Sequence, residues 1–403
     1  MARPLDGIRI LEWAAWFAGP GAAMLLGDLG AEVIKIEQPR VGDPSRGMTR
    51  LEGANMRVGM GLYSGINRSK KCILVDVTKP KGKEIVYRLV PKCDVFLQNF
   101  RASVRNRAGL DYATLSQYNP KLVYANVSSL GPDGPENWRR GNDSIGQARS
   151  GFMSNFNRLL GEPATLGGGI ADHGTSIITA WGIVTALLAR ELQGIGQEID
   201  TSLTGSMIEF QRIRFNNTFL QGEEVVRGTR TTATNPLVNH YKCQDGKWIV
   251  FCALASDIVW PDFCQVIGRP ELEKNPRFAT TDKRAENCVE LIEILDKVFA
   301  TKPRDEWVEL VGKYHRIMFS PVLEGLEVAN DPQAVENKYV VEYEQPPIGK
   351  IKTIGHPIKF HKTPASIQLP APEFGQHTEE VLLDIGGYTW EDIAQFKEEG
   401  VIG

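Results

Sequence analysis

The stretch IRILEWAAWFAGPGAAMLLGDLGAEVIKIEQ, residues 8–38, decides the fold of this protein. It opens with a short apolar run at residues 8–13, which predicts a buried strand. A Gly/Pro turn and a short helix are predicted over residues 18–30, and a second strand over residues 32–38. Strands that alternate with helices in this way predict a mostly parallel, doubly wound sheet.

The same alternation continues through the first half of the chain. Further strands are predicted at residues 72–77, 94–99, 122–129 and 198–203. Helical spacing of apolar residues marks residues 82–92, and a long helix is predicted over residues 174–192. The predicted fold class is therefore α/β, and ligands of such sheets bind at the carboxyl ends of the strands.

The second half of the chain has a different pattern. Residues 240–254 predict a hairpin that turns at Asp245-Gly246, and helices with charged faces follow. These features predict a smaller α+β domain over residues 223–330. The large domain takes residues 1–222 plus 331–403, and its tail is expected to be Pro-rich and extended before a helix at HTEEVLLDIG. A length of 403 residues suits two domains.

Composition excludes several classes of function. The net charge is -3 with both signs spread along the chain, so we expect no nucleic-acid partner. The six cysteines form no CxxC pair, which favours reduced thiols in a cytoplasmic protein and no metal site. No stretch is expected to reach the length of a membrane span. P-loop, HExxH and G-x-S-x-G motifs are absent from the sequence.

Three groups of basic residues lie near the predicted sheet edges. They are Lys70 and Lys71 before one strand, Arg101, Arg105 and Arg107 after the next, and Arg139 and Arg140 after a third. A polyphosphate ligand needs several fixed cations to replace its hydration, and these groups would supply them. A solvated basic rim with no ligand is the alternative, and the sequence alone favours it.

Asp172 is the one acidic residue in GGGIADHGTSIITAWG, residues 167–182. An aspartate at a helix N-terminus commonly accepts hydrogen bonds from the free N–H groups there. The three glycines before it would also let a ligand approach closely, and then the carboxylate could act as a nucleophile. His173 is interpreted as a structural neighbour. Arg149 would either clamp a ligand carboxylate or form an ion pair within the domain.

Several segments together resemble the class III CoA-transferases of the CaiB–BaiF type. They are PLDGIRILEW, AGPGAAMLLGDLGAEVIKIEQPRVGDPSRG, NRSKKCILVDV, DVFLQNFRASVRNRAGLDY, IADHGTSIITAWGIVTALLARELQGIGQEID and GQHTEEVL. The resemblance implies a Rossmann-like large α/β domain with an inserted smaller domain. It also implies two chains interlocked as an obligate dimer, and coenzyme A, in the form of an acyl-CoA, as co-substrate without a metal.

The resemblance also implies roles for individual residues. The catalytic aspartate of the family falls on Asp172, and its acid near the acyl group falls on Asp143. Its CoA-contacting positions fall on Ala18, Lys70, Asn99, Phe100, Arg107 and Arg140. Relatives often carry a base at Gln38, and Arg40 is expected to compensate. Relatives often carry a polar residue in the stretch that is Ala15-Trp16-Phe17 here, and Trp16 and Phe17 are expected to form an apolar wall for the acyl group.

The chemistry that this resemblance implies is covalent. Asp172 would attack an acyl-CoA thioester, pass through an anhydride and an aspartyl-CoA thioester, and hand CoA to an acceptor acid. Backbone N–H groups of the Gly-rich stretch would hold the oxyanion. A run of four glycines found in formyl-CoA transferase is absent, which disfavours formyl or oxalyl groups. With Arg149 meeting a free carboxylate, the expected pair is succinyl-CoA and an aromatic or branched dicarboxylic acid such as benzylsuccinate.

Two other functions stay open from the sequence. An acyl-CoA racemase would need a second proton-transfer group, and relatives of that kind carry Gly-His-Asp where this chain has Gly141-Asn142-Asp143. Asparagine cannot act as a base at neutral pH. A non-catalytic CoA-binding subunit that supports a paralogous partner is the other alternative. A homodimer and a heteromer are both compatible with the sequence.

Overall fold

The structure, a computed structural model, describes residues 2–47, 50–51, 54–55, 61–156, 160–224 and 228–403. Contacts between residues divide the chain into two compact units. The first consists of Met1–Ile213 and Pro332–Gly403, and the second of Arg214–Asp331. The sequence placed the two domain boundaries after residues 222 and 330.

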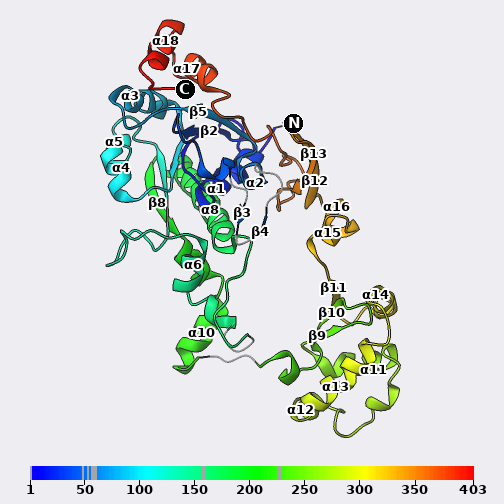
Figure 1. The fold of residues 1–403 in the computed structure, drawn as a ribbon. Helices are drawn as coiled ribbons and strands as arrows, with labels where there is room; N and C mark the ends of the chain where they lie inside the picture. Colours follow the sequence, from blue (N-terminus) through cyan, green and yellow to red (C-terminus); the bar gives the residue numbers. More distant parts are fainter. Residues whose placement is uncertain (1, 48–49, 52–53, 56–60, 157–159, 225–227) are drawn as a thin grey trace. The chain divides into compact units, whose positions relative to one another are not determined.

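A six-stranded parallel sheet, of which Figure 1 labels β5, β2 and β8, forms the centre of the first unit. Its strand order is β5-β2-β1-β6-β7-β8. The strands are β1 (Arg9–Trp13), β2 (Glu32–Glu37), β5 (Lys70–Leu74), β6 (Val95–Gln98), β7 (Val123–Ser128) and β8 (Gln197–Ser202). A two-stranded antiparallel ladder, β3 (Arg50–Leu51) with β4 (Ala54–Asn55), lies outside this sheet. The predicted α/β class with a parallel sheet is confirmed.

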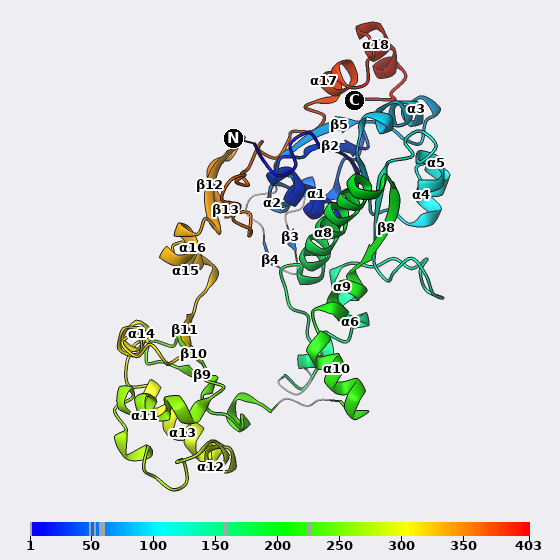
Figure 2. The same cartoon turned by 180° about the vertical axis from the view of Figure 1, so that it is seen from behind.

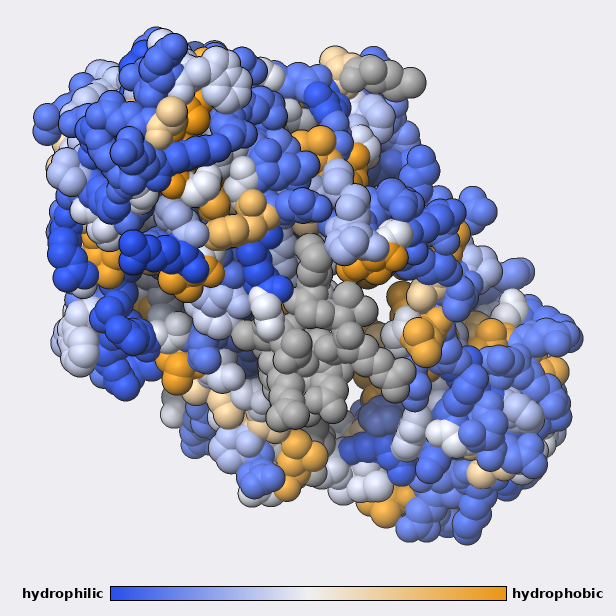
Figure 3. Space-filling model, turned by 45° about the horizontal axis from the view of Figure 1, so that its top comes forward, coloured by the Kyte–Doolittle hydropathy of each residue, from blue (hydrophilic) through white to orange (hydrophobic). Residues whose placement is uncertain are grey.

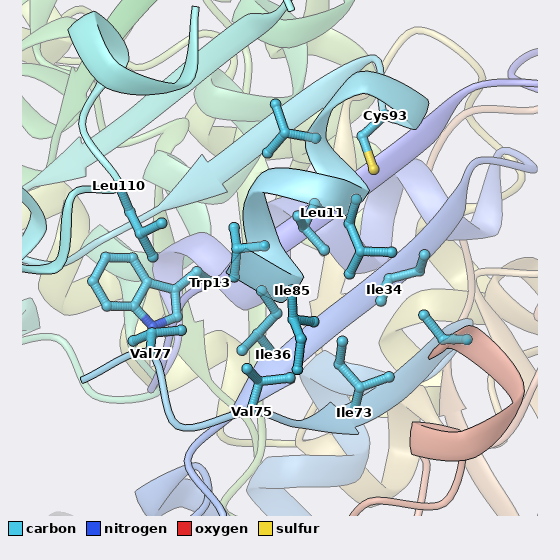
Figure 4. Packing of buried hydrophobic residues seen from close by; sticks show 14 of the residues in the cluster. Leu11, Trp13, Ile34, Ile36, Ile73, Val75, Val77, Ile85, Cys93 and Leu110 are labelled. Atoms are coloured by element: carbon cyan, nitrogen blue, oxygen red, sulfur yellow. The ribbon is translucent and has the colours of Figure 1, made fainter. Parts of the chain in front are cut away.

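Helices cover both faces of the sheet, and this explains why its inner strands are apolar without interruption. Side chains alternate between the faces, so that Leu11 and Ile34 pack on one side while Ile10 and Val33 pack on the other. The first face meets Ile85 and its neighbours on a helix (Figure 4). Its helices are α3 (Pro80–Leu89), α4 (Ala102–Ala108), α5 (Tyr112–Leu115), α17 (Thr378–Asp384) and α18 (Trp390–Glu398).

The other face is covered by α1 (Ala18–Asp28) and α8 (Ile170–Gln193), which run side by side (Figure 2). Shorter helices in this unit are α2 (Gly61–Asn67), α6 (Asp143–Arg149), α9 (Leu203–Glu209) and α10 (Arg212–Gln221), the last crossing into the second unit by sequence. With 24 residues, α8 is long and apolar enough to cross a membrane by length and composition. By this test of length and composition, the expectation that no stretch reaches the length of a membrane span was wrong.

The second unit has its own core. A three-stranded antiparallel sheet consists of β9 (Val238–Lys242), β10 (Trp248–Cys252) and β11 (Phe319–Val322). The predicted hairpin is confirmed, and Gly246 takes the left-handed φ of 81° that its turn requires. Aromatic side chains, among them Phe251 and Phe299, pack between this sheet and the helices. Those helices are α11 (Ser256–Val266), α13 (Cys288–Phe299) and α14 (Arg304–Val311), and the unit also contains α12 (Thr281–Glu286) and α15 (Gly325–Val328).

The tail returns to the first unit with more structure than the sequence indicated. After α16 (Pro332–Glu336), the strands β12 (Val340–Gln345) and β13 (Gly349–Ile354) form an antiparallel hairpin. The chain that was expected to be extended is thus paired into a hairpin with the prolines at 346 and 347 in its turn, while residues 355–377 contain no helix or strand. The face of the molecule drawn in Figure 3 is mostly hydrophilic, with apolar side chains in small groups.

Candidate active site

A large cavity opens at the carboxyl ends of the parallel strands in the first unit. Its volume is about 1540 Å³. Its walls come from the segments that follow β1, β2, β6 and β7, and from the glycines that lead into α8. Among the predicted site residues, those that line it are Trp16, Phe17, Ala18, Asn99, Phe100, Arg140, Asp143 and Asp172. Residues far apart in the sequence therefore meet where doubly wound sheets bind their ligands.

Asp172 lies in the first turn of α8, partly buried at the cavity wall. Burial and the nearby charge of Asp143 raise the pKa of its carboxyl from 3.8 to about 7. The predicted helix start at residue 174 is corrected to Ile170, because Gly169 takes a left-handed φ of 71° and begins the helix. A carboxyl group that titrates near neutrality, inside a large cavity, is suited to chemistry rather than to capping alone.

Asp143 performs the capping that the sequence suggested for Asp172. Its side chain is 8% exposed, and Oδ1 accepts hydrogen bonds from the backbone N–H groups of Ala171 (2.7 Å) and Asp172 (3.2 Å). Its Oδ2 accepts a hydrogen bond from Nε2 of Gln147. The N–H groups of Ala171 and Asp172 are thereby occupied. Any oxyanion held by backbone N–H groups here must therefore use the glycines before the helix.

The aromatic wall of the cavity comes from the loop between β1 and α1. Trp16 adopts a left-handed φ of 68°, which is rare for a residue with a large side chain. Its backbone N–H donates a hydrogen bond to Oδ1 of Asp43 at 3.2 Å. The side chain of Asn99 forms two hydrogen bonds with the backbone of Ala15. Its Oδ1 accepts from the N–H of Ala15 (3.0 Å), and its Nδ2 donates to the carbonyl of Ala15 (2.6 Å). The Phe17 ring meets the His173 ring edge-on at 4.5 Å. His173 thus packs against the wall, as its structural interpretation requires, and burial lowers its pKa.

A buried cluster of charges lies beneath this wall. Nζ of Lys35 is 2.9 Å from Glu12 and 2.9 Å from Asp43, and donates to the carbonyl of Ala14. Nζ of Lys70 is 2.8 Å from the other oxygen of Glu12. Lys70 is 0% exposed, and burial lowers its pKa to about 8. The structure does not bring Lys70 to the cavity, because this first residue of β5 directs its side chain to Glu12 in the cluster.

The structure places three more predicted residues outside the cavity. Arg40 and Arg107 are exposed and are absent from its lining. Arg149 is 57% exposed and forms an ion pair with Glu136 at 2.7 Å, beside a separate small hollow. Of its two interpretations, the ion pair is the one that the structure contains. The cations that do line the cavity are Arg101, Arg105, Arg139 and Arg140, all from the basic groups seen in the sequence.

Some lining residues were not assigned from the sequence. Trp138 lines the cavity and precedes Arg139, and an exposed tryptophan in a Gly/Pro loop was the available signal. Asp200 lines it from within β8. Gln147 does not line the cavity but hydrogen-bonds to Asp143, four residues earlier on the same helix. Within the described residues, no group of His, Cys, Asp and Glu is arranged to hold a metal ion, and the six cysteines are free.

Known proteins resemble this chain over almost its whole length. The profile of CoA-transferase family III matches residues 5–378. A succinyl-CoA–D-citramalate CoA-transferase of Chloroflexus aurantiacus is 31% identical over 99% of this chain and 98% of its own. A human succinyl-CoA:glutarate CoA-transferase is 32% identical, covering 99% and 90%. A formyl-CoA:oxalate CoA-transferase of Rhodopseudomonas palustris is 29% identical, covering 100% and 98%.

Solved structures agree with these sequence matches. The crystal structure of a CAIB/BAIF family protein from Brucella suis superposes with a TM-score of 0.84 and 27% identity. The superposition covers 96% of this chain and 100% of that one. Fold and sequence therefore point to the same family.

Proposed function

This chain belongs to CoA-transferase family III and is an enzyme of that family, and we propose that Asp172 is its nucleophile. The observation that carries the proposal is the single partly buried carboxylate in the first turn of α8, facing a cavity of about 1540 Å³. That volume exceeds the roughly 300–1,000 Å³ of most small-molecule pockets. It therefore has room for a long thioester together with a second acid.

The reaction proceeds by acyl transfers among the donor acyl-CoA, Asp172 and the acceptor acid, and it needs no other reactant. One oxygen of Asp172 attacks the thioester carbonyl of the donor, the C–S bond breaks, and an anhydride and CoA thiolate form. The thiolate then attacks the aspartyl carbonyl, which releases the donor acid and leaves an aspartyl-CoA thioester. The acceptor carboxylate attacks that thioester, and the freed thiolate attacks the acceptor half of the new anhydride. This step returns Asp172 and forms the new acyl-CoA.

The cavity cations suit the phosphates of coenzyme A. Arg101 and Arg105 come from the start of α4, Arg139 and Arg140 come from the loop after β7, and all four line the same cavity. Guanidinium groups bind phosphate oxygens through paired, charge-assisted hydrogen bonds. Ala18, Asn99 and Phe100 line the same cavity, as do Gly168, Gly169 and Asp172, where the thioester would react.

The acceptor is proposed to be a dicarboxylic acid, with succinyl-CoA as donor. The relatives are named for citramalate, glutarate and oxalate. Benzylsuccinate has no support among these names, and Arg149, which was expected to meet its free carboxylate, lies outside the cavity. The second carboxylate would instead pair with one of the cavity arginines.

The structure gives a reason to disfavour the racemase alternative. Asn142, at the position where a base was required, caps α6 by accepting a hydrogen bond from the N–H of Ile145 at 3.3 Å. Its side chain is thereby committed to the helix start. We also propose that the working form is the interlocked dimer and that it acts in the cytoplasm.

Trapping the covalent intermediate tests this function. Incubation with succinyl-CoA and hydroxylamine should give a hydroxamate on the peptide that contains Asp172, identified by mass spectrometry. Its rate of formation should rise with pH up to about 7, because only the ionised carboxyl attacks. Asp172→Asn should abolish the adduct. Asp200→Asn, which alters another carboxylate of the cavity wall, should leave it in place. An adduct on another residue, or none with any acyl-CoA, contradicts the proposal.

A further inference from the structure

Gln147 is a polar side chain with 0% exposure that contacts Asp143, the residue that accepts the N–H of the proposed nucleophile. Its Nε2 donates to Oδ2 of Asp143 and to the carbonyl of Leu166 at 3.0 Å. Its Oε1 accepts from the N–H of Leu166 at 2.8 Å. A carboxylate only accepts hydrogen bonds, so the amide nitrogen must face Asp143 and its orientation is fixed. All these polar groups of Gln147 are used inside the protein.

The two partners of Gln147 both lead to Asp172. Asp143, which Gln147 holds, accepts the N–H groups of Ala171 and Asp172 and so fixes the first turn of α8. Leu166 directly precedes the three glycines that enter this helix, of which Gly168 and Gly169 line the cavity. The helix α6 also lies close to α8, since a Cβ on Gly146 would lie 3.4 Å from the Cβ of Ala171.

We infer that Gln147 is a positioning residue, which sets the place of Asp172 by fixing both Asp143 and the entry to the glycine turn. The inference rests on the proposed role of Asp172. It assigns a function to a residue that touches neither the cavity nor a substrate. A buried amide with these hydrogen bonds tolerates few replacements, because each lost bond leaves a buried polar group unpaired.

The pKa of Asp172 distinguishes a positioning role from a merely structural one, because replacing a residue that only supports the fold would not change it. Among the described charged groups, Asp143 is the one whose charge raises the pKa of Asp172, in addition to burial. Without a donor from residue 147, Oδ2 of Asp143 loses the hydrogen bond that fixes its side chain, and the carboxylate is free to turn away from Asp172. Such a movement takes negative charge away from the neighbourhood of Asp172. A second carboxyl at position 147 would keep at least one negative charge there.

The experiment titrates Asp172 in the free protein. Labelling with a water-soluble carbodiimide and an amine, read by peptide mass spectrometry from pH 5 to 9, gives the midpoint of its ionisation. Gln147→Met should lower this midpoint by about half a pH unit or more, whereas Gln147→Glu should leave it or raise it. Gln211→Met is the matched control, because Gln211 is also buried and also clamps backbone carbonyls, those of Ser150 and Met207.

Several results would overturn the inference. They are a shift in the same direction for both variants, no shift in either, or an equal shift in the Gln211 control. If Gln147→Met does not fold, a downward shift in Gln147→Glu alone contradicts it. In the acylation assay, Gln147→Met should lower the rate at Asp172 by roughly tenfold or more with little change in the affinity for acyl-CoA. Absence of any adduct in the unaltered protein would refute the proposed function and leave the titration test standing.

Discussion

Asp172 is held in a state that favours reaction over stability. Its carboxyl has a raised pKa of about 7 in the folded chain, against an ordinary value of 3.8. Below pH 3.8 the group is neutral in both states and costs nothing. Between 3.8 and 7 the unfolded chain gives up the proton first, so the free energy of unfolding falls as pH rises. Above pH 7 the full cost remains, up to about 4 kcal/mol by linkage.

Asp172→Asn should therefore stabilise the protein while it abolishes activity. At pH 8 the variant should melt at a higher temperature than the unaltered chain, and near pH 4 the difference should nearly vanish. Thermal unfolding followed by circular dichroism at the two pH values measures this. Asp200→Asn removes an exposed carboxylate and should change neither melting temperature. A gain of the same size at both pH values would show that burial of charge is not the cause.

At the level of single residues, the sequence predicted which residues belong to the site better than it predicted where their side chains lie. It singled out Asp172, and the structure puts that residue at the cavity wall. Lys70 and Lys71 show why placement fails, because neighbours in a strand point to opposite faces. Lys70 points inward to Glu12, and Lys71 points outward to Glu32 and Glu380. A register that is set by distant strands decides which lysine is buried.

At the level of elements, buried strands were predicted well and helix ends less well. The strands of the parallel sheet are apolar runs, so each predicted range overlaps an observed strand. The start of α8 moved from 174 to Ile170 because Asp143, which is distant in sequence, accepts the N–H groups of its first turn. Local spacing carries no information about such a partner.

The packing of α1 on α8 gives a second test at this scale. Gly21 lies against Ser176, whose hydroxyl donates to the carbonyls of Ala18 and Asp172 at 2.9 Å each. A methyl group on Gly21 would overlap that hydroxyl, so Gly21→Ala should destabilise the protein by about 1–3 kcal/mol. Thermal melting measures the change, and slower acylation of Asp172 should accompany it.

Gly65 provides the control for this substitution. It lies on the exposed side of α2, and a Cβ there meets no other atom within 4 Å. Gly65→Ala should therefore stabilise the chain slightly, by roughly 0.5–1 kcal/mol, through helix propensity. If both substitutions change stability in the same direction, close packing of α1 on α8 is not what requires glycine at position 21.

At the level of the whole molecule, α8 is apolar on more sides than a single chain can bury. One face packs on α1 and the sheet through Ala171, Ile183 and Leu187. The opposite face leaves a stripe exposed, which consists of Ile177, Trp181, Val184, Leu188 and Leu192. These residues recur every three or four positions, the spacing of one helical face. A helix that is apolar all round belongs inside a larger assembly, and exposed apolar stripes mark contact surfaces.

A second copy of the chain is the partner expected on this stripe, in line with the proposed dimer. Size-exclusion chromatography with light scattering should give twice the chain mass of 44.7 kDa. Trp181→Glu should shift the protein toward monomer, because it places a charge where an apolar surface is to be buried. Trp390→Glu, on α18, is the matched control, since the two tryptophans are 68% and 62% exposed. A monomeric unaltered chain, or equal dissociation in both variants, contradicts the dimer. Recovery of the protein only with detergent would instead assign the stripe to a membrane.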